Sequence, residues 1–188
     1  MAMMRYKVDK YASLEMNYAE YLATGNIVSQ IPLGEEFTAE APCENGMWVC
    51  ADRARKAIAP ITGAEDMIGI VYTAEKEYNP WEIGLKNFRK VAGDYPRVGV
   101  LSKGDTFTSN CFQYDSDEFA DQTAVDKALK ALATTPLYLA PVVGSAVPKL
   151  TATKPATGAY ATVVKFYTVP NGEPGIKYNM NRVYGGAN

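Results

Sequence analysis

Apolar residues of this chain occur mostly in short segments, and turn-forming residues separate them. After Gly25 the segments alternate with clusters rich in Gly, Pro, Asn and Asp; the clearest segments are 47–50, 68–72, 98–101 and 160–169, and the clearest clusters are 44–46 and 170–175. Strands with this punctuation are typical of β-sandwiches and β-barrels, whereas a parallel α/β sheet needs a helix between successive strands. We therefore expect a mainly β fold.

The N-terminal segment, residues 1–25, has a different pattern. Its apolar side chains recur at the spacing of one helical face: Tyr11, Leu14, Tyr18, Tyr21 and Leu22. Asp9 is a suitable N-cap and Gly25 a suitable terminator, which predicts a helix of about 14 residues. We expect this segment to form an N-terminal helical arm.

A second helix is expected at about residues 117–133. Ser116 is a suitable N-cap, Pro136 would end the helix, and the apolar positions between them keep helical spacing: Phe119, Ala120, Ala124, Val125, Ala128, Leu129 and Leu132. The acidic residues at the start of this segment favour the positive end of the helix macrodipole.

Comparison of the chain with itself suggests an internal repeat. Both halves contain a Gly, an acidic residue and then Phe-Thr, at 34–38 and 104–108, and further matches follow in the same order: 70–73 with 165–168, and 84–86 with 175–177. The second copy is longer by about the length of the 115–136 segment, which we interpret as an insertion. This predicts two related small β-barrel or β-sandwich units, residues 26–97 and residues 98–188. Equivalent core positions are then expected for Phe37 and Phe107 and for Tyr72 and Tyr167.

The chain contains no histidine. This excludes Ser-His-Asp and Cys-His nucleophile sites, His-ligated zinc and a histidine proton shuttle, so a binding or structural role is favoured over an enzyme. It also predicts that binding of a partner changes little between about pH 6 and 8.

Charge and hydropathy narrow the range of partners. The net charge is −2, the basic residues are scattered, and the local cluster Arg53, Arg55 and Lys56 fits a solvated turn better than a phosphate site. We therefore expect no direct contact with nucleic acid. No apolar run approaches the length of a membrane span and no signal-peptide core is present, so we expect a soluble protein made in the cytoplasm.

The three cysteines, Cys43, Cys50 and Cys111, form no metal-binding motif. Asn45-Gly46 predicts a hairpin turn that would place Cys43 opposite Trp48 and diagonal to Cys50. Diagonal Cα atoms lie roughly 7–8 Å apart, beyond disulfide reach. We expect three free thiols.

Acidic residues occur in near pairs, which a glycosidase or a calcium site would require: Glu35 with Glu36, Glu65 with Asp66, Glu75 with Glu77, and Asp115 with Asp117 and Glu118. Each group lies beside an expected turn, and 115–118 lacks the glycine and the distal glutamate of an EF-hand. Solvated turns and helix capping are the favoured interpretations. The sequence predicts no catalytic, metal or cofactor site.

An aromatic stripe near the N-terminus is the candidate binding site. Tyrosine buries a large area and keeps a hydrogen-bonding end, a profile enriched where proteins dock on one another. The candidate docking residues are Tyr6, Tyr11, Leu14, Tyr18, Tyr21 and Leu22. The alternative interpretation is that the stripe packs on the protein's own β units.

Strand and turn patterns over most of residues 44–178 resemble a family of structural proteins; the segments that carry the likeness are 46–50, 68–78, 84–88, 95–98, 103–110 and 164–175. The chain resembles small head proteins of tailed bacteriophages, of the capsid decoration or cement type. The resemblance implies a protein without catalysis or cofactor that binds the outer surface of a phage capsid and stabilises it, with the major capsid protein and neighbouring copies of itself as partners. It implies a location on the virion.

Other functions remain open at this stage. A tail or baseplate protein would have nearly the same features. A carbohydrate-binding β module would need an exposed row of aromatic residues, with Trp48, Tyr78, Trp81 and Tyr95 as candidates. A small hydrolase would need a cleft with a perturbed carboxylate or thiol. For the capsid hypothesis, we expect deletion of residues 1–24 to leave a folded protein that attaches less well.

Overall fold

The structure is a computed structural model of the 188-residue chain, and it describes residues 2–6, 11–15, 20, 27–52, 54–63, 67–73, 89–168 and 173–183. The described part is mainly β, as expected, and it contains two sheets and one helix. The elements are β1 (Met3–Arg5), β2 (Ile27–Val28), β3 (Trp48–Asp52), β4 (Ala57–Pro60), β5 (Ile68–Val71), β6 (Val98–Val100), β7 (Thr106–Ser109), β8 (Gln113–Asp115), α1 (Gln122–Lys130), β9 (Tyr138–Ala140), β10 (Lys149–Thr151), β11 (Tyr160–Thr168) and β12 (Pro174–Arg182).

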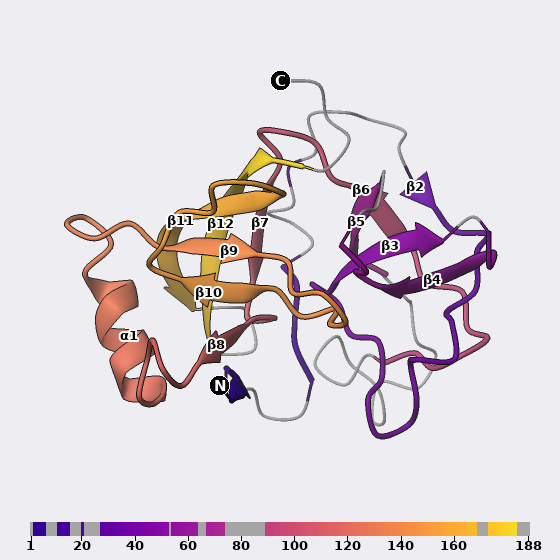
Figure 1. The fold of residues 1–188 in the computed structure, drawn as a ribbon, viewed down its shortest axis with the longest axis horizontal. Coiled ribbons are helices and arrows are strands. Elements are labelled where there is room, and N and C mark those ends of the chain that lie inside the picture. The colour runs from indigo at the N-terminus through magenta and orange to yellow at the C-terminus, as the bar shows by residue number, and fades with distance from the viewer. Residues whose placement is uncertain are drawn as a thin grey trace.

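Sheet A has seven strands in the order β1-β8-β10-β9-β11-β12-β7, and only the β8–β10 pair is parallel. Residues 110–112 alone separate β7 from β8 along the chain, although the two strands lie near opposite ends of this order. Four residue steps reach at most about 14 Å, whereas six flat strands span about 24 Å. Sheet A is therefore strongly curled, as Figure 1 shows.

Sheet B has five antiparallel strands in the order β2-β6-β5-β3-β4. Leu33 forms a parallel bridge to Ile58 of β4, so the short segment after β2 connects one edge of the sheet to the other. Sheet B is therefore also curled, because this short connection could not span five flat strands. Strand β6 belongs to sheet B and β1 belongs to sheet A, so the two sheets divide the chain differently from the expected units 26–97 and 98–188.

Two clusters of buried side chains hold the sheets together. The central core lies between them and joins Trp48, Ile68 and Ile70 of sheet B to sheet A residues such as Phe107 and Tyr178. The sheet B core fills the other face of sheet B and contains Leu33, Phe37, Val49, Val71 and Val98. Neighbouring residues of β3 and β5 enter opposite cores because successive strand side chains alternate between faces. Both faces of sheet B are therefore buried.

The N-terminal segment is extended, not helical, at its described residues. β1 pairs with β8, the Tyr6 N–H donates to the Phe112 carbonyl at 3.0 Å, and Leu14 and Glu20 form antiparallel bridges to β7. The expected helix is wrong at residues 11–15 and 20, and the rest of its range lies outside the described residues. The spacing of apolar residues predicted a helix, but it carries no information on the hydrogen bonds that this segment forms with the backbone of residues 106–115.

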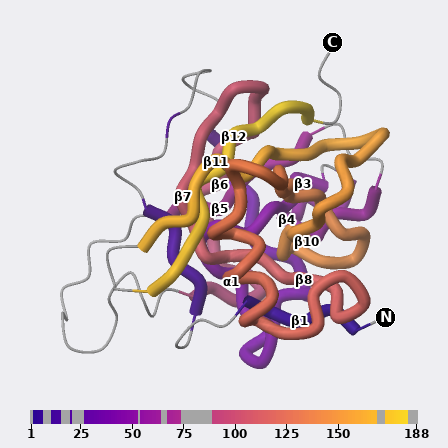
Figure 2. The backbone as a smooth tube through the Cα atoms, turned by 90° about the vertical axis from the view of Figure 1, so that its left-hand side faces the viewer, coloured from indigo at the N-terminus to yellow at the C-terminus, as the bar shows by residue number. Residues whose placement is uncertain are grey.

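The second expected helix is confirmed in a shorter form. α1 covers Gln122–Lys130, and its N-cap is Asp121, whose side chain accepts a hydrogen bond from the Ala124 N–H at 2.8 Å. Ser116 is not the N-cap, because it lies in a turn that Asp115 closes through the Asp117 N–H. Val125 and Leu129 face the central core, and α1 lies at the end of the molecule opposite sheet B (Figures 1 and 2).

The expected repeat has no counterpart in the described structure. Phe37 follows a turn and lies outside any strand in the sheet B core, whereas Phe107 lies in β7 and in the central core. Gly104 has a φ of +96°, and Gly34 is not in the left-handed region. Tyr72 follows β5, whereas Tyr167 lies within β11. The third match, 84–86, lies outside the described residues.

The turn at Asn45-Gly46 is present, but it is not part of the expected hairpin. Gly46 has a φ of +88°, and the Met47 N–H donates to the Glu44 carbonyl at 3.3 Å. Cys43 bridges to Lys90 and does not face Trp48. All three cysteines are buried free thiols, which confirms that prediction. Within the described ranges, no helix is long and apolar enough to cross a membrane.

Candidate functional site

Two of the expected docking residues belong to the protein's own core. Tyr6 is fully buried, stacks on Phe112 with ring centroids 4.4 Å apart, and donates its hydroxyl to Asp126 of α1 at 2.5 Å. Burial raises the pKa of Tyr6, and the Asp126 carboxylate adds to that rise. Leu14 is also buried in the central core. For these two residues the alternative interpretation, packing on the protein's own β structure, describes their contacts.

Tyr11 is the expected docking residue that remains partly exposed. Arg89 donates to its hydroxyl at 2.5 Å, and the Arg89 guanidinium carbon lies 5.6 Å from its ring centroid. Tyr18, Tyr21 and Leu22 lie outside the described residues. The structure therefore does not bring the predicted stripe together as one exposed surface at its described positions.

Two carboxylates of the acidic segment at 115–118 pair with a lysine of the same chain. Lys149 lies 3.1 Å from Asp115 Oδ2 and 3.7 Å from Glu118 Oε2. The hydrogen bond from the Asp117 N–H, and then Lys149, hold the pKa of Asp115 below its ordinary value. Within the described ranges, no group of three His, Cys, Asp or Glu side chains is placed to hold a metal ion. These carboxylates cap a turn and pair with β10.

A second acidic group lines a cavity of about 420 Å³ between the N-terminal strand and the loop before β10. Arg5 forms an ion pair with Glu44 at 2.8 Å, and Glu44 also accepts the Ala12 N–H at 2.6 Å. Glu36, on the same cavity, pairs with Arg55 at 2.6 Å. These contacts anchor loops, because each of the two carboxylates already has a cation of the same chain beside it.

The thiols are poorly suited to nucleophilic chemistry. Burial raises the pKa of Cys111 to about 12 and raises that of Cys43 as well. Cys50 Sγ donates to backbone carbonyls of β4. A buried, protonated thiol packs like a small apolar side chain and is a poor nucleophile.

The aromatic residues considered for carbohydrate binding do not form an exposed row at their described positions. Trp48 is fully buried, and its Nε1–H donates to the Tyr178 hydroxyl at 3.3 Å, whereas Tyr95 is 57% exposed. Tyr78 and Trp81 lie outside the described residues. A buried indole has no free face for a sugar ring.

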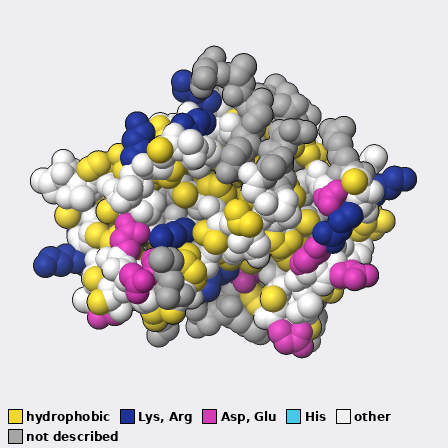
Figure 3. Space-filling view, viewed as in Figure 1, with side chains coloured by type: hydrophobic (Ala, Val, Ile, Leu, Met, Phe, Trp, Pro, Cys, Tyr) yellow, Lys and Arg dark blue, Asp and Glu magenta, His cyan; other side chains and the backbone are white. Residues whose placement is uncertain are grey.

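Charged side chains are mixed over the surface. On the face in Figure 3, acidic and basic side chains are interspersed, and neither sign forms a continuous patch. On this face the distribution agrees with the small net charge and contains no basic stripe of the kind that phosphate binding requires.

Several exposed apolar side chains lie on strands that have an unpaired edge among the described residues, whereas Val143, which is 70% exposed, and Tyr95 lie in loops. Met3 and Met4 of the edge strand β1 are 38% and 42% exposed, and Ile27 of the edge strand β2 is 51% exposed. β11 continues to Thr168 beyond its last described pairing with β9 at Thr162, and Val164 in that extension is 57% exposed. Free edges with apolar side chains are the usual sites of pairing with another chain.

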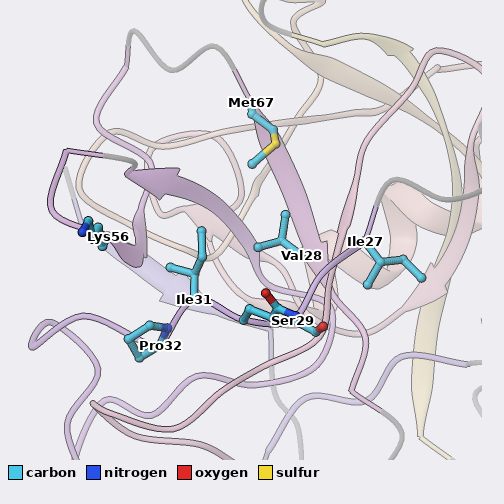
Figure 4. Close-up of a pocket in the computed structure, with 8 residues that line it drawn as sticks. Ile27, Val28, Ser29, Ile31, Pro32, Lys56 and Met67 are labelled. Atoms are coloured by element: carbon cyan, nitrogen blue, oxygen red, sulfur yellow. The ribbon is translucent and has the colours of Figure 1, made fainter.

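The largest apolar hollow among the described cavities lies beside β2. It has a volume of about 800 Å³ and is lined by residues 27–32 together with Lys56 and Met67. Figure 4 shows Val28 and Ile31 directed toward Met67, with Lys56 and Ile27 at opposite ends. Sequence reasoning missed this groove, because no residue in it carries a catalytic motif. Its only sequence signal is an apolar pair followed by two polar residues and Ile-Pro.

Comparison with protein-family models, with curated proteins and with solved structures finds no match to this chain. The function is therefore argued from the sequence and from the geometry above.

Proposed function

We propose that this protein is a non-enzymatic structural component of a virion, which binds the outer surface of a phage capsid and stabilises it. The observation that carries the proposal is the set of strand edges with exposed apolar side chains at β1, at β2 and at the end of β11 beyond Thr162, which have no partner strand among the described residues. Most soluble monomers protect such edges, because they are templates for pairing with another chain.

The remainder of the molecule supports an assembly role. Both sheets are curled around continuous buried cores, and the edge strands belong to these packed sheets. The free edges lie on different parts of the molecule, so one copy has separate surfaces for the major capsid protein and for neighbouring copies. Repeated copies on a regular shell would gain avidity from weak individual contacts.

Three described polar side chains that could serve chemistry have structural roles. Lys149 neutralises Asp115, Arg5 neutralises Glu44, and burial keeps Cys111 protonated. A decoration protein needs no catalytic group, and these contacts instead tie loops and strands together.

Cryo-electron microscopy of particles from the host that encodes this chain tests the proposal. We expect density for the two-sheet body on the outer capsid surface, and we expect particles without the gene product to lose their DNA at a lower temperature. Density on the tail or baseplate would replace the proposal with the tail-protein alternative. Particles that lack the protein altogether would overturn both.

A further inference from the structure

The groove beside β2 has a free backbone edge as well as apolar walls. β2 pairs with β6 on one side only. Ser29, Gln30 and Ile31, which continue the chain along the groove, make no hydrogen bond with any other residue in the part of the chain that the structure describes. Among the described residues, the N–H and C=O groups of residues 29–31 therefore lack a backbone partner, and the chain bends at Gln30 and Ile31.

The walls of the groove suit apolar side chains. Ile27, Val28, Ile31, Pro32 and Met67 line it, and Val28 and Ile31 are directed toward Met67 (Figure 4). Val28 and Ile31 also pack against the sheet B core, so this wall is continuous with the interior of the protein. Alternate side chains of an extended segment could be buried here while its backbone pairs with β2.

One cation is placed at the end of the groove without an acidic partner. Lys56 lies in the β3–β4 turn with a φ of +52°, and no described carboxylate forms an ion pair with it. Its neighbour Arg55, by contrast, is paired with both Glu36 and Asp52. Lys56 thus lies beside an apolar groove without an ion-pair partner among the described residues.

We propose that this groove binds an extended polypeptide segment of a partner protein, paired by its backbone with β2 and carrying an acidic side chain that meets Lys56. A fatty acid would fill the apolar walls but would leave the backbone groups of residues 29–31 without a partner. The identification of the partner as the shell protein rests on the proposed function. The chemistry of the segment rests on the groove alone.

Selection from a displayed library of random linear decapeptides against the full chain tests the groove. We expect the selected peptides to alternate apolar residues and to share one Asp or Glu. In fluorescence anisotropy, Lys56→Glu and Ile27→Lys should each weaken binding of these peptides by at least about 10-fold. N-methylation of alternate peptide amides should abolish binding, because it removes the backbone donors.

Lys127→Glu is the matched control. It makes the same charge change on α1, at the end of the molecule opposite β2, and should leave peptide affinity unchanged. Thermal unfolding confirms that each variant is folded before binding is measured.

Two results would overturn the inference: a selection without enrichment, or peptides that bind the groove variants as tightly as the unchanged protein. Concentration-dependent dimerisation that Ile27→Lys abolishes would assign the groove to a second copy instead.

The proposed function can fail independently of the groove. Peptide binding without attachment to particles removes the virion role and keeps the groove. Equal decoration of particles by the unchanged protein and by both groove variants keeps the virion role and removes the groove as its contact.

Discussion

Tyr6 connects the N-terminal strand to the helix. Its ring packs in the central core against Phe112, and its hydroxyl reaches Asp126 on α1. A hydrogen bond from a buried hydroxyl to a carboxylate contributes about 1.5–3 kcal/mol. A single side chain thereby couples three parts of the fold.

Tyr6→Phe should lower the free energy of unfolding by about 1.5–2 kcal/mol, because it removes this hydrogen bond and leaves the ring packing intact. Urea denaturation measures the change. Tyr95→Phe is the control; Tyr95 is 57% exposed, and its variant should stay within about 0.5 kcal/mol of the unchanged protein. Equal stability of Tyr6→Phe would contradict the contact with Asp126.

Because of Asp115, we expect the free energy of unfolding to depend on pH in the acidic range. Its pKa is lowered in the folded state by the Asp117 N–H and by Lys149, so its contribution is fully present above the unfolded pKa of about 3.9. The contribution is lost as pH falls through the lower, folded pKa. We expect urea midpoints to stay constant between about pH 6 and 8, where no unperturbed side chain of this histidine-free chain titrates, and to fall below about pH 4.

Asp115→Asn separates this residue from the other carboxylates. The variant should be less stable at pH 7, and it should lose less of its remaining stability than the unchanged protein when the pH is lowered from about 5 to 3. The same acid-induced loss in both proteins would show that Asp115 is not the group responsible.

Among the elements, α1 is stabilised at its N-terminus by one side chain. Asp121→Ala should cost about 1 kcal/mol, because the Ala124 N–H loses its acceptor. Ser116→Ala, the change at the N-cap expected from the sequence, should cost less than about 0.5 kcal/mol. Chemical denaturation followed by circular dichroism compares the two, and a larger effect at Ser116 would move the helix start.

The turn at Gly46 is the point where the N-terminal segment, β7 and β8 meet. A Cβ at this position would lie 2.8 Å from the Cys111 Cβ and would also contact Ser109 Oγ, which donates to the Ser13 carbonyl at 2.8 Å. The positive φ and the crowding act together, so no small shift of one side chain would accommodate an added methyl group.

Gly46→Ala should therefore lower stability by about 2–4 kcal/mol. Gly93→Ala is the matched control, because Gly93 has a φ of +86° and no atom within 4 Å of an added Cβ. That variant should cost only about 1 kcal/mol for the backbone conformation. Equal costs in guanidinium denaturation would rule out the steric contribution at Gly46.

In the whole molecule, the N-terminal segment connects both ends of sheet A. β1 pairs with β8 at one end, and Leu14 and Glu20 bridge to β7 at the other. The buried side chains Tyr6 and Leu14 belong to the same segment. This segment is part of the fold, and a role in docking alone does not describe it.

Deletion of residues 1–24 should abolish cooperative unfolding, in contrast to the expectation from the sequence. Removal of two large buried side chains costs about 6–10 kcal/mol, which is comparable to the whole stability of a typical domain. Near-ultraviolet circular dichroism and thermal scans measure the loss. Addition of a synthetic peptide of residues 1–24 should restore the signal; a truncated chain that unfolds cooperatively by itself would contradict the structure.

Local patterns predicted much of this fold. Short apolar segments and turn residues indicated β structure, helical spacing located α1 within a few residues, and Asn45-Gly46 marked a real turn. The free thiols were predicted as well. These features depend on side-chain period and on the conformations that Gly, Asn and Pro allow, so they can be read within a window of a few residues.

The pairing of strands was decided only in the tertiary structure. The spacing of Tyr11 and Leu14 fits a helical face, yet Leu14 bridges to Ser109, and Cys43 pairs with Lys90 in place of Trp48. Backbone N–H and C=O groups are the same in every residue except proline, which lacks the N–H, so a strand partner distant along the chain leaves no mark in the local pattern. The β2 groove has the same origin: curling of sheet B brings residues 27–32, Lys56 and Met67 together, and no local pattern records that curvature.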